Sequence, residues 1–299
     1  MEDVIEQQIL DVEKDPIDRR DFKASEVLAE VGIPSKFCYA SPAIKNQEGV
    51  GACVGFAAAT LKEIQEWNEN KENLKFSPFF IYWQRGWESK GMYCRQAVNI
   101  LKEQGICYDA TILRPYTYKE SDTIPERAFG EAKNYKIDSY LRISELSELK
   151  KALYQYGPVL ISMVINKSFH NMGKEAIVPP YSSEDPYMGC HAVSIIGYDN
   201  EKKLLKVQNS WGMGWGDQGC FYIPYDVFRN YVLDAWLAVD AKSDKISWKY
   251  FTYTLWEHFK VKVKKNKVGA FMGLIFGSFV GLNILFGKNK DIKTVETHE

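Results

Sequence analysis

Apolar residues follow two different periods along this chain, and the change between them divides it into two halves. After Cys53 they recur at helical spacing, with charged and amide side chains between them, which predicts a helix of roughly 15 residues beginning at that cysteine. Ser77 followed by Pro78 is typical of the first turn of a second helix. The segment 95–104 has the same spacing and is followed by Gly105, which predicts a third helix ending there.

Short, continuous apolar runs replace the helical spacing in the second half of the chain. Bounded by turn residues, such runs predict buried β-strands, and they cover residues 158–165, 191–198, 204–209 and 219–223. A helical first half and a β-rich second half predict an α+β protein with two lobes, at about residues 18–135 and 136–240. Residues 1–17 are acidic and are expected to form a loose lead-in to the folded domain.

A third pattern occurs near the end of the chain, where residues 268–287 contain no charged side chain. At ~1.5 Å per residue this segment is long enough to span the ~30 Å hydrocarbon core of a bilayer, so it predicts a single transmembrane helix. Six lysines precede it and three follow it, and the positive-inside rule then places the larger, N-terminal part of the chain in the cytoplasm. The alternative is a segment that docks in a partner protein or particle.

Two polar stretches frame the apolar segment. Residues 241–267, rich in aromatic residues and lysine, are expected to form a juxtamembrane linker, and residues 288–299 a polar tail. Glycine recurs at every fourth position of the predicted span, which would let two such helices approach closely: Gly269, Gly273, Gly277 and Gly281. Self-association through this face is one expectation, and a lone anchor is the other.

The overall composition of the chain argues against several classes of function. A net charge of −1 gives no sign of a nucleic-acid-binding surface. The six cysteines include no C-x-x-C pair, so a zinc ribbon is not indicated, and no motif calls for a metal or a cofactor. The acidic N-terminus has no apolar run of the kind found in signal peptides, so the cysteines are expected to be free, in a reducing compartment.

Residues able to carry nucleophilic catalysis occur in two segments far apart in the sequence. Gln47 precedes Cys53 by six residues, and His191 precedes Asn209 by 18. A cysteine attacks as the thiolate, so it needs an imidazole to take its proton and another side chain to orient that imidazole. The first turn of a helix also favours a thiolate. Singly, each residue could be a core or turn residue; together they indicate cysteine-dependent catalysis between two lobes.

The order and surroundings of these residues resemble the papain-like cysteine peptidases. The resemblance covers about residues 18–240, and its most specific part is the block Asn-Ser-Trp-Gly-x-Gly-Trp-Gly at 209–216. It implies a papain-like fold, with a helical lobe and a β-barrel-like lobe. It also implies that Cys53 is the nucleophile, His191 its proton partner, and Asn209 the residue that holds the ring. The amide of Gln47 and the backbone N–H of Cys53 would stabilise the oxyanion.

The resemblance further implies a set of substrate-facing residues, namely Gly51, Gly91, Met92, Ser162 and Trp211. Gly91 and Met92 align with the substrate shelf of the family, and Ser162 would edge the pocket for the second residue before the scissile bond. Trp211 would also shield the catalytic ring from water. For Gly91 and Ser162, ordinary surface or core positions are the alternative.

These observations predict a cysteine-type endopeptidase that acts on polypeptide substrates and is tethered to a membrane by a C-terminal helix. Two alternatives stay open: a catalytically silent or structural component, for example of a virus or phage particle, and a transpeptidase that uses the same dyad. Only about 17 residues precede the domain, so the long inhibitory propeptide of lysosomal members is not expected, and activity must be restrained in some other way.

Overall fold

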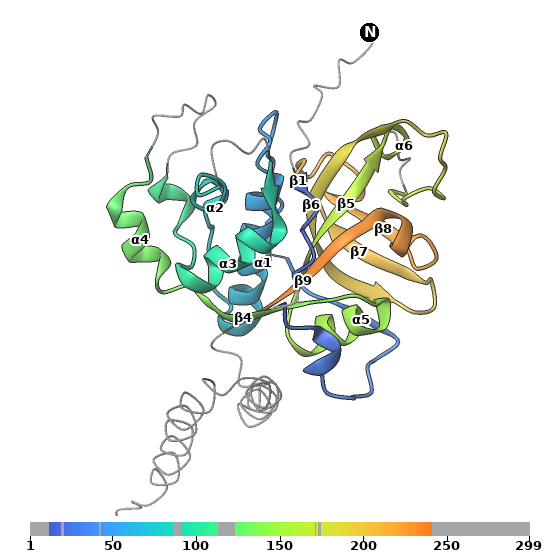
Figure 1. Ribbon diagram of the computed structural model, residues 1–299, viewed down its shortest axis with the longest axis horizontal. Coiled ribbons are helices and arrows are strands. Elements are labelled where there is room, and N and C mark those ends of the chain that lie inside the picture. Colours follow the sequence, from blue (N-terminus) through green and yellow to red (C-terminus); the bar gives the residue numbers. More distant parts are fainter. Residues whose placement is uncertain are drawn as a thin grey trace, which may run out of the picture. The chain divides into compact units, whose positions relative to one another are not determined.

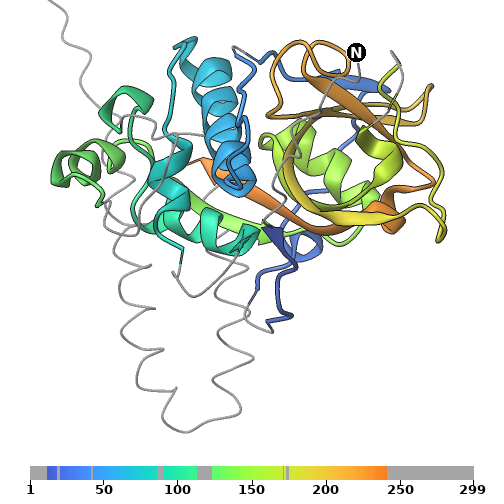
Figure 2. The same cartoon turned by 90° about the horizontal axis from the view of Figure 1, so that it is seen from above.

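The structure is a computed structural model that describes residues 12–18, 21–41, 43–85, 91–112, 123–170, 172 and 175–240. The predicted span 268–287, with its linker, tail and glycine face, lies outside these residues, so its prediction stays a prediction. The described part has a helical lobe and a β-rich lobe side by side (Figures 1 and 2). This arrangement matches the α+β architecture expected from the change of hydrophobic period.

Short helices build the first lobe around one long helix, α1 (Cys53–Asn70). Ser77 caps α2, and its side chain accepts a hydrogen bond from the backbone N–H of Phe80. Gly105 follows α3 with φ of 87°, a conformation that suits glycine at the end of a helix. The other elements of this lobe are α2 (Pro78–Tyr82), β3 (Met92–Tyr93), α3 (Cys94–Glu103), η2 (Asp109–Thr111) and α4 (Glu126–Ala132).

An antiparallel sheet forms the second lobe, in the strand order β4-β9-β5-β6-β7-β8, with β2 pairing to β6. Its strands are β2 (Lys36–Cys38), β4 (Ile137–Arg142), β5 (Val159–Asn166), β6 (Tyr187–Asp199), β7 (Leu204–Gln208), β8 (Cys220–Pro224) and β9 (Val232–Asp240). Short helices accompany it, namely η1 (Ala24–Glu26), α5 (Leu146–Gln155), α6 (Lys167–His170) and α7 (Phe228–Tyr231). The four predicted strands correspond to β5 to β8, whereas the hydrophobic runs did not reveal β4 and β9.

Helix α1 is buried over its first 14 residues, including polar residues that the helical pattern placed between apolar ones. Lys62 is 1% exposed and makes ion pairs with Glu66, at 2.7 Å, and with Asp240 at the end of β9. Glu63 pairs with Lys45 at 2.8 Å and accepts the backbone N–H of Phe76 at 2.7 Å. A buried charge is tolerated only when it is paired, so these contacts make a fully enclosed α1 possible.

Two side-chain hydrogen bonds fasten the sheet to α1. The hydroxyl of Ser194, on β6, donates to the carbonyl oxygen of Ala57 at 2.9 Å. The amide of Gln65 donates to the carbonyl oxygen of Ala238, on β9, at 2.9 Å. Ala57 lies one turn after Cys53, so the first bond holds β6 against the start of the helix.

The N-terminal segment differs from the expected loose lead-in. Residues Val12–Glu13 form strand β1, which pairs in parallel with β3 of the helical lobe. Val12 and Asp15 are 7% and 2% exposed, as low as core residues. The folded part therefore includes residues 12–18, and the boundary expected at residue 18 is corrected by this packing. The acidic composition of this segment did not predict its burial. The carboxylate of Asp15 can be buried because it accepts hydrogen bonds within the fold.

We expect Gly55→Ala, in α1, to lower the free energy of unfolding by about 1–3 kcal/mol. A Cβ at residue 55 would lie too close to the backbone oxygen of Pro78, at the start of α2. The matched control is Gly130→Ala in α4, where no atom lies within 4 Å of the new carbon. That change should stabilise the helix by about 0.5–1 kcal/mol. Urea unfolding of both variants tests the pair, and equal stabilities would contradict the close approach of α1 and α2.

Candidate active site

Gln47 lies in the loop before α1 and has no exposed surface. Its side-chain oxygen accepts the hydroxyl of Ser210 at 2.6 Å, and its backbone N–H donates to the carbonyl of the same serine at 2.7 Å. The amide nitrogen donates one hydrogen to the carbonyl oxygen of Val50 at 3.0 Å. A carbonyl oxygen can only accept, so this bond fixes which end of the amide is nitrogen. Since an amide nitrogen carries two hydrogens, Gln47 keeps a second donor.

Cys53 is the first residue of α1, after the N-cap residue Ala52. It is not part of a disulfide and has no exposed surface. The backbone N–H groups of the first helical turn point away from the helix body and have no partner within the helix, so a negative charge on this sulfur would be stabilised there. Cys53 belongs to one packed cluster with Ala192 and Cys190 of β6, so the strand that carries His191 lies against it.

His191 lies within β6, opposite Met163 of β5, and has no exposed surface. Its Nε2 is 2.8 Å from Oδ1 of Asn209. The same oxygen accepts the backbone N–H of Ser210 at 2.8 Å. An amide oxygen can only accept, so Nε2 must carry the hydrogen. In the neutral ring Nδ1 is then the acceptor, and within the described part of the chain it is buried without a hydrogen-bond partner.

Aromatic rings enclose the bond between His191 and Asn209. Trp211 stacks on the ring of His191, with centroids 4.9 Å apart and planes inclined by 30°. Trp211 also contacts the ring of Phe169 edge-on. It stacks on the ring of His170, with the two ring centroids 5.4 Å apart and the planes inclined by 7°. The shielding expected of Trp211 therefore has a geometric basis. His170, which sequence reasoning left among surface residues, is a second imidazole close to the site.

Burial lowers the pKa of His191 to about 4. The hydrogen bond to Asn209 acts in the opposite direction, and the nearby His170 lowers the pKa further. Burial also lowers the pKa of His170 itself. A positively charged ring at residue 191 therefore needs a negative charge close by.

The residues predicted to face the substrate are buried in the structure. Met92 forms β3, directly after Gly91, and both are buried at the edge that β1 pairs with. Ser162, on β5, has no exposed surface, and its hydroxyl donates to the carboxylate of Asp234 at 3.2 Å. Gly51 is buried two residues before Cys53. The side chains that sequence reasoning missed are Ser210, which orients Gln47, and Asp234, because neither contact follows from spacing along the chain.

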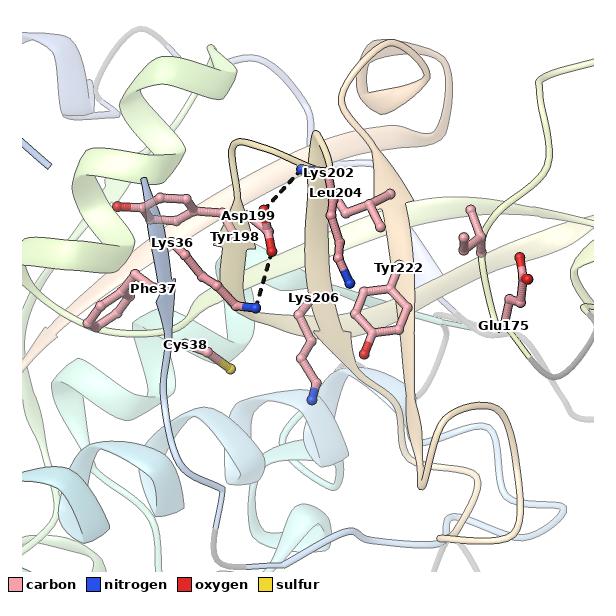
Figure 3. Close-up of a pocket in the computed structure, with 11 residues that line it drawn as sticks. Lys36, Phe37, Cys38, Glu175, Tyr198, Asp199, Lys202, Leu204, Lys206 and Tyr222 are labelled. Carbon is pink, nitrogen blue, oxygen red and sulfur yellow. Dashed lines mark hydrogen bonds and ion pairs between the residues drawn. The ribbon is translucent and has the colours of Figure 1, made fainter. Parts of the chain in front are cut away.

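A separate pocket of about 410 Å³ lies on the β-rich lobe. Lys36, Lys202 and Lys206 face it with Tyr222, and Lys36 pairs with Asp199 at 3.2 Å (Figure 3). None of the candidate catalytic side chains lines this pocket. Within the described ranges, no group of three or more His, Cys, Asp and Glu residues is placed to hold a metal ion.

Comparison with known proteins agrees with this geometry. The profile of the papain family cysteine proteases matches residues 34–234. The chain belongs to the papain family. It is 29% identical over 216 residues to an uncharacterized peptidase C1-like protein of Acanthamoeba polyphaga mimivirus, covering 65% of this chain and 67% of that protein. It is 24% identical over 195 residues to a cysteine protease of Blomia tropicalis, covering 60% of this chain and 56% of that protein.

Solved structures agree on the fold. Xylellain, a cysteine protease from Xylella fastidiosa, superposes with a TM-score of 0.70 at 22% identity, covering 79% of this chain and 97% of that one. The papain-like α+β fold and the assignment as a cysteine peptidase, both expected from the motifs, are confirmed. The chain spans little more than half the length of the Blomia tropicalis relative.

We expect the ring of His191 to stay neutral at pH 6 in a Cys53→Ser variant, because burial holds its pKa near 4 when no thiolate is present. In the unsubstituted protein the ring should be positive at that pH if the thiolate forms. Nitrogen chemical shifts of the imidazole measure both states. If His191 instead had a pKa near the ordinary value of about 6.5 in Cys53→Ser, the ring would not be buried away from water as described.

The stacked His170 offers a control in the same experiment. Replacing it in the Cys53→Ser background, as His170→Gln, should raise the pKa of His191, because a neighbouring ring that can become positive is removed. The rise should be below about one pH unit, since Trp211 separates the two rings. An unchanged or lower pKa would mean that the two imidazoles are not electrostatically coupled.

Proposed function

We propose that this papain-family protein hydrolyses peptide bonds, with Cys53, His191, Asn209 and Gln47 as its catalytic group. The observation that carries the proposal is the 2.8 Å bond between Nε2 of His191 and Oδ1 of Asn209, which leaves Nδ1, within the described part of the chain, buried without a hydrogen-bond partner. This is the tautomer that can take a proton from the thiol. A merely structural histidine would use both nitrogens.

In the first half of the reaction the proton of Cys53 passes to Nδ1 of His191, and the thiolate attacks the carbonyl carbon of the scissile bond. The tetrahedral intermediate carries a negative oxygen. The free N–H of Gln47 and the backbone N–H of Cys53 would stabilise this oxygen, a donation worth about 3–4 kcal/mol per donor. Collapse of the intermediate breaks the C–N bond, and His191 returns its proton to the leaving amine.

In the second half, water attacks the thioester while His191 takes one of its protons. The carbon–sulfur bond breaks, the acid product leaves, and the thiolate and imidazolium are restored. Trp211 keeps bulk water from the bond between the ring and Asn209, so the ring stays oriented through both halves. Transpeptidation differs only in that an amine replaces this water, and product analysis separates the two reactions.

Turnover of an unstructured protein should fall to background in Cys53→Ala, because the proposed mechanism uses the sulfur of Cys53 as its nucleophile. Asn209→Ala should retain a weak activity, since the dyad survives without its orienting amide. The lost bond also frees the ring to turn, so kcat should fall more than KM rises. Cleavage that persists in Cys53→Ala would contradict the mechanism.

Cys38→Ser serves as the matched control for these variants. Cys38 is an exposed free thiol on β2, where it pairs with Gly197 of β6, six residues along that strand from His191. Its replacement should leave turnover unchanged while removing a competing site for thiol reagents. A catalytically silent protein would show no turnover in any form, including the Cys38→Ser protein.

We further propose that residues 268–287 tether the protein to a membrane, with the catalytic domain on the cytoplasmic side. In the part of the chain that the structure describes, no helix is both long and apolar enough for a membrane span. The support for the tether is the uncharged sequence of this segment and its flanking lysines. The alternative is that the same segment docks in a virion or in a partner protein.

The full chain should sediment with membranes and resist extraction by high salt, because insertion of apolar residues is not screened as surface charge is. A chain ending after Asp240 should stay in the supernatant and retain cysteine peptidase activity. Replacing Gly273 and Gly277 by leucine should reduce self-association without releasing the protein from the membrane. A full chain found in the soluble fraction would contradict the tether.

A further inference from the structure

The pocket on the β-rich lobe is a second candidate site, apart from the catalytic group. Its volume of about 410 Å³ lies in the range of about 300–1,000 Å³ in which ligands usually bind. Strands β2, β6, β7 and β8 line it, together with the turn after β6 and with Glu175 and Ile177. The proposed reaction uses none of the side chains that line this pocket, so the catalytic proposal leaves it without a role.

The pairing of the strands brings the lining side chains onto one side of the sheet. Lys206 of β7 lies opposite Tyr222 of β8. Two residues earlier in β7, Leu204 lies opposite Asp199 of β6, which is itself opposite Lys36 of β2. Side chains two residues apart on a strand point to the same face. Four strands therefore direct polar and apolar groups into the same pocket.

Positive charge surrounds the pocket, on the side chains of Lys36, Lys202 and Lys206 (Figure 3). Within the described part of the chain, neither Lys202 nor Lys206 forms an ion pair. The ammonium of Lys206 lies over the ring of Tyr222, 6.0 Å from its centroid. The hydroxyl of Tyr222 donates to the carboxylate of Asp217 at 2.6 Å, which holds this ring in place. Two ammonium groups and a fixed aromatic ring therefore face the pocket.

Asp199 positions the third ammonium group, that of Lys36, through the ion pair at 3.2 Å. Its carboxylate also accepts the backbone N–H groups of Lys202 at 3.0 Å and Glu201 at 3.1 Å. The bond from Lys202 and the charge of Lys36 hold the pKa of Asp199 below its ordinary value, so this carboxylate stays ionised. An ammonium carries three hydrogens, so Lys36 can donate to Asp199 and to a ligand together. Glu175 is the other carboxylate among the described lining residues, which leaves an excess of positive charge.

The rest of the lining is apolar, with side chains from Phe37, Tyr198, Leu204 and Ile177. Ile177 is 37% exposed. An inorganic anion would leave this apolar surface unused. Phosphate sites generally add an arginine or a helix N-terminus, and the described lining contains neither. The lining therefore suits carboxylates that alternate with apolar side chains, which is the chemistry of an acidic peptide segment.

Two strands connect this pocket to the catalytic group. On β6, Gly197 comes six residues after His191, and Lys206 of β7 comes three residues before Asn209. At ~3.3 Å per residue, six residues of strand extend over at most about 20 Å. An extended polypeptide needs about six residues to span that distance. One polypeptide can therefore occupy the pocket and reach the catalytic group.

We propose that this pocket is an exosite, a site away from the cleaved bond, that binds an acidic segment of a polypeptide substrate. Lys36, Lys202 and Lys206 contact the carboxylates of the segment, and Tyr222 packs against its apolar side chains. The inference rests on the proposed function in one respect, namely that the bound polypeptide is a substrate of Cys53. Occupation of the exosite raises the effective concentration of the scissile bond at the catalytic group, so it lowers KM without changing kcat.

The first test measures binding without turnover, in the full-length Cys53→Ala protein in a non-ionic detergent. The probe is a fluorescein-labelled short peptide in which glutamate alternates with leucine and phenylalanine, and its anisotropy is read. A peptide with glutamine in place of every glutamate is the comparison. The acidic peptide should bind about fivefold more tightly, and added salt should reduce the difference because exposed charges are screened. Equal binding of the two peptides would overturn the proposal.

Lys206→Glu should weaken binding of the acidic peptide about fivefold or more, because a charge at the pocket is reversed. Lys203→Glu is the matched control. It makes the same change at an exposed residue of the adjoining turn that does not line the pocket, so the Kd should stay within about twofold of the parent. Equal weakening by Lys203→Glu would indicate general attraction to a positive surface and overturn the site. Lys202→Gln, at an exposed residue, replaces Lys206→Glu if that variant does not fold.

Cys38 opens onto the pocket and reports where the peptide lies. Bound acidic peptide should slow the alkylation of Cys38 by N-ethylmaleimide, read by mass spectrometry on the peptide that contains it. Protection of Cys190, the neighbour of His191, in place of Cys38 would locate the probe at the catalytic group and overturn the exosite. Equal protection of Cys38 by inorganic phosphate or citrate at the same concentration would overturn an acidic peptide as the occupant.

The second test connects the pocket to catalysis in the protein with Cys53 intact. A quenched-fluorescence peptide of mixed sequence is compared with the same peptide joined to the acidic segment by a flexible linker. The joined substrate should have a KM about fivefold lower at the same kcat. Lys206→Glu should abolish this difference, whereas Lys203→Glu should retain it.

The two proposals fail in different ways. Turnover of both substrates with equal KM would overturn the exosite and leave the catalytic proposal intact. No turnover of either substrate, with binding that still depends on Lys206 in the Cys53→Ala protein, would overturn the proposed function and leave a binding site for acidic peptides.

Discussion

The packing of β6 against the start of α1 is the contact on which the catalytic arrangement depends. It joins the residue that carries the thiol to the strand that carries the imidazole, and the bond from Ser194 to Ala57 fixes their relative position. Such a bond contributes only about 0.5–1.5 kcal/mol, so most of the stability comes from the apolar surface buried on both sides of α1. The helix is enclosed so completely that even Lys62 and Glu66 are inside, paired with each other and with Asp240. The proposed site is thus built at the start of a helix whose first 14 residues are buried.

The loop after β7 performs a second positioning task with adjacent residues. Asn209 orients His191, while Ser210 orients Gln47 by accepting its backbone N–H and donating to its side-chain oxygen. A shift of this loop would disturb the imidazole of His191 and the amide of Gln47, the proposed oxyanion donor, together. The aromatic cover formed by Trp211 follows directly in the chain, so one short segment orients both groups and keeps them dry.

Much of this could be predicted from the sequence, for physical reasons that are local. The start of α1, the strands β5 to β8, and the order of the catalytic residues follow from periodicity and from a motif with dense chemical requirements. Contacts between distant segments could not be predicted. Asp15 is an acidic residue in an acidic stretch, and only its distant partner Trp236 makes it part of the interior. Burial of Lys62 could not be predicted for the same reason, since its partner Asp240 is 178 residues away. His170 gave no signal in sequence because its relevance arises from a ring stack on Trp211.

Burial has the same effect on His191 and on Asp15, because it favours the neutral form of every ionisable group. It lowers the pKa of His191 to about 4 and raises that of Asp15 to about 6. The described packing therefore favours a neutral imidazole at residue 191 and a protonated carboxyl group at residue 15. Access of water to either group would move its pKa back toward the ordinary value. Under the proposed mechanism the ring of His191 has to become positive, so in this dry site its charge must be balanced by the thiolate of Cys53 and not by solvent.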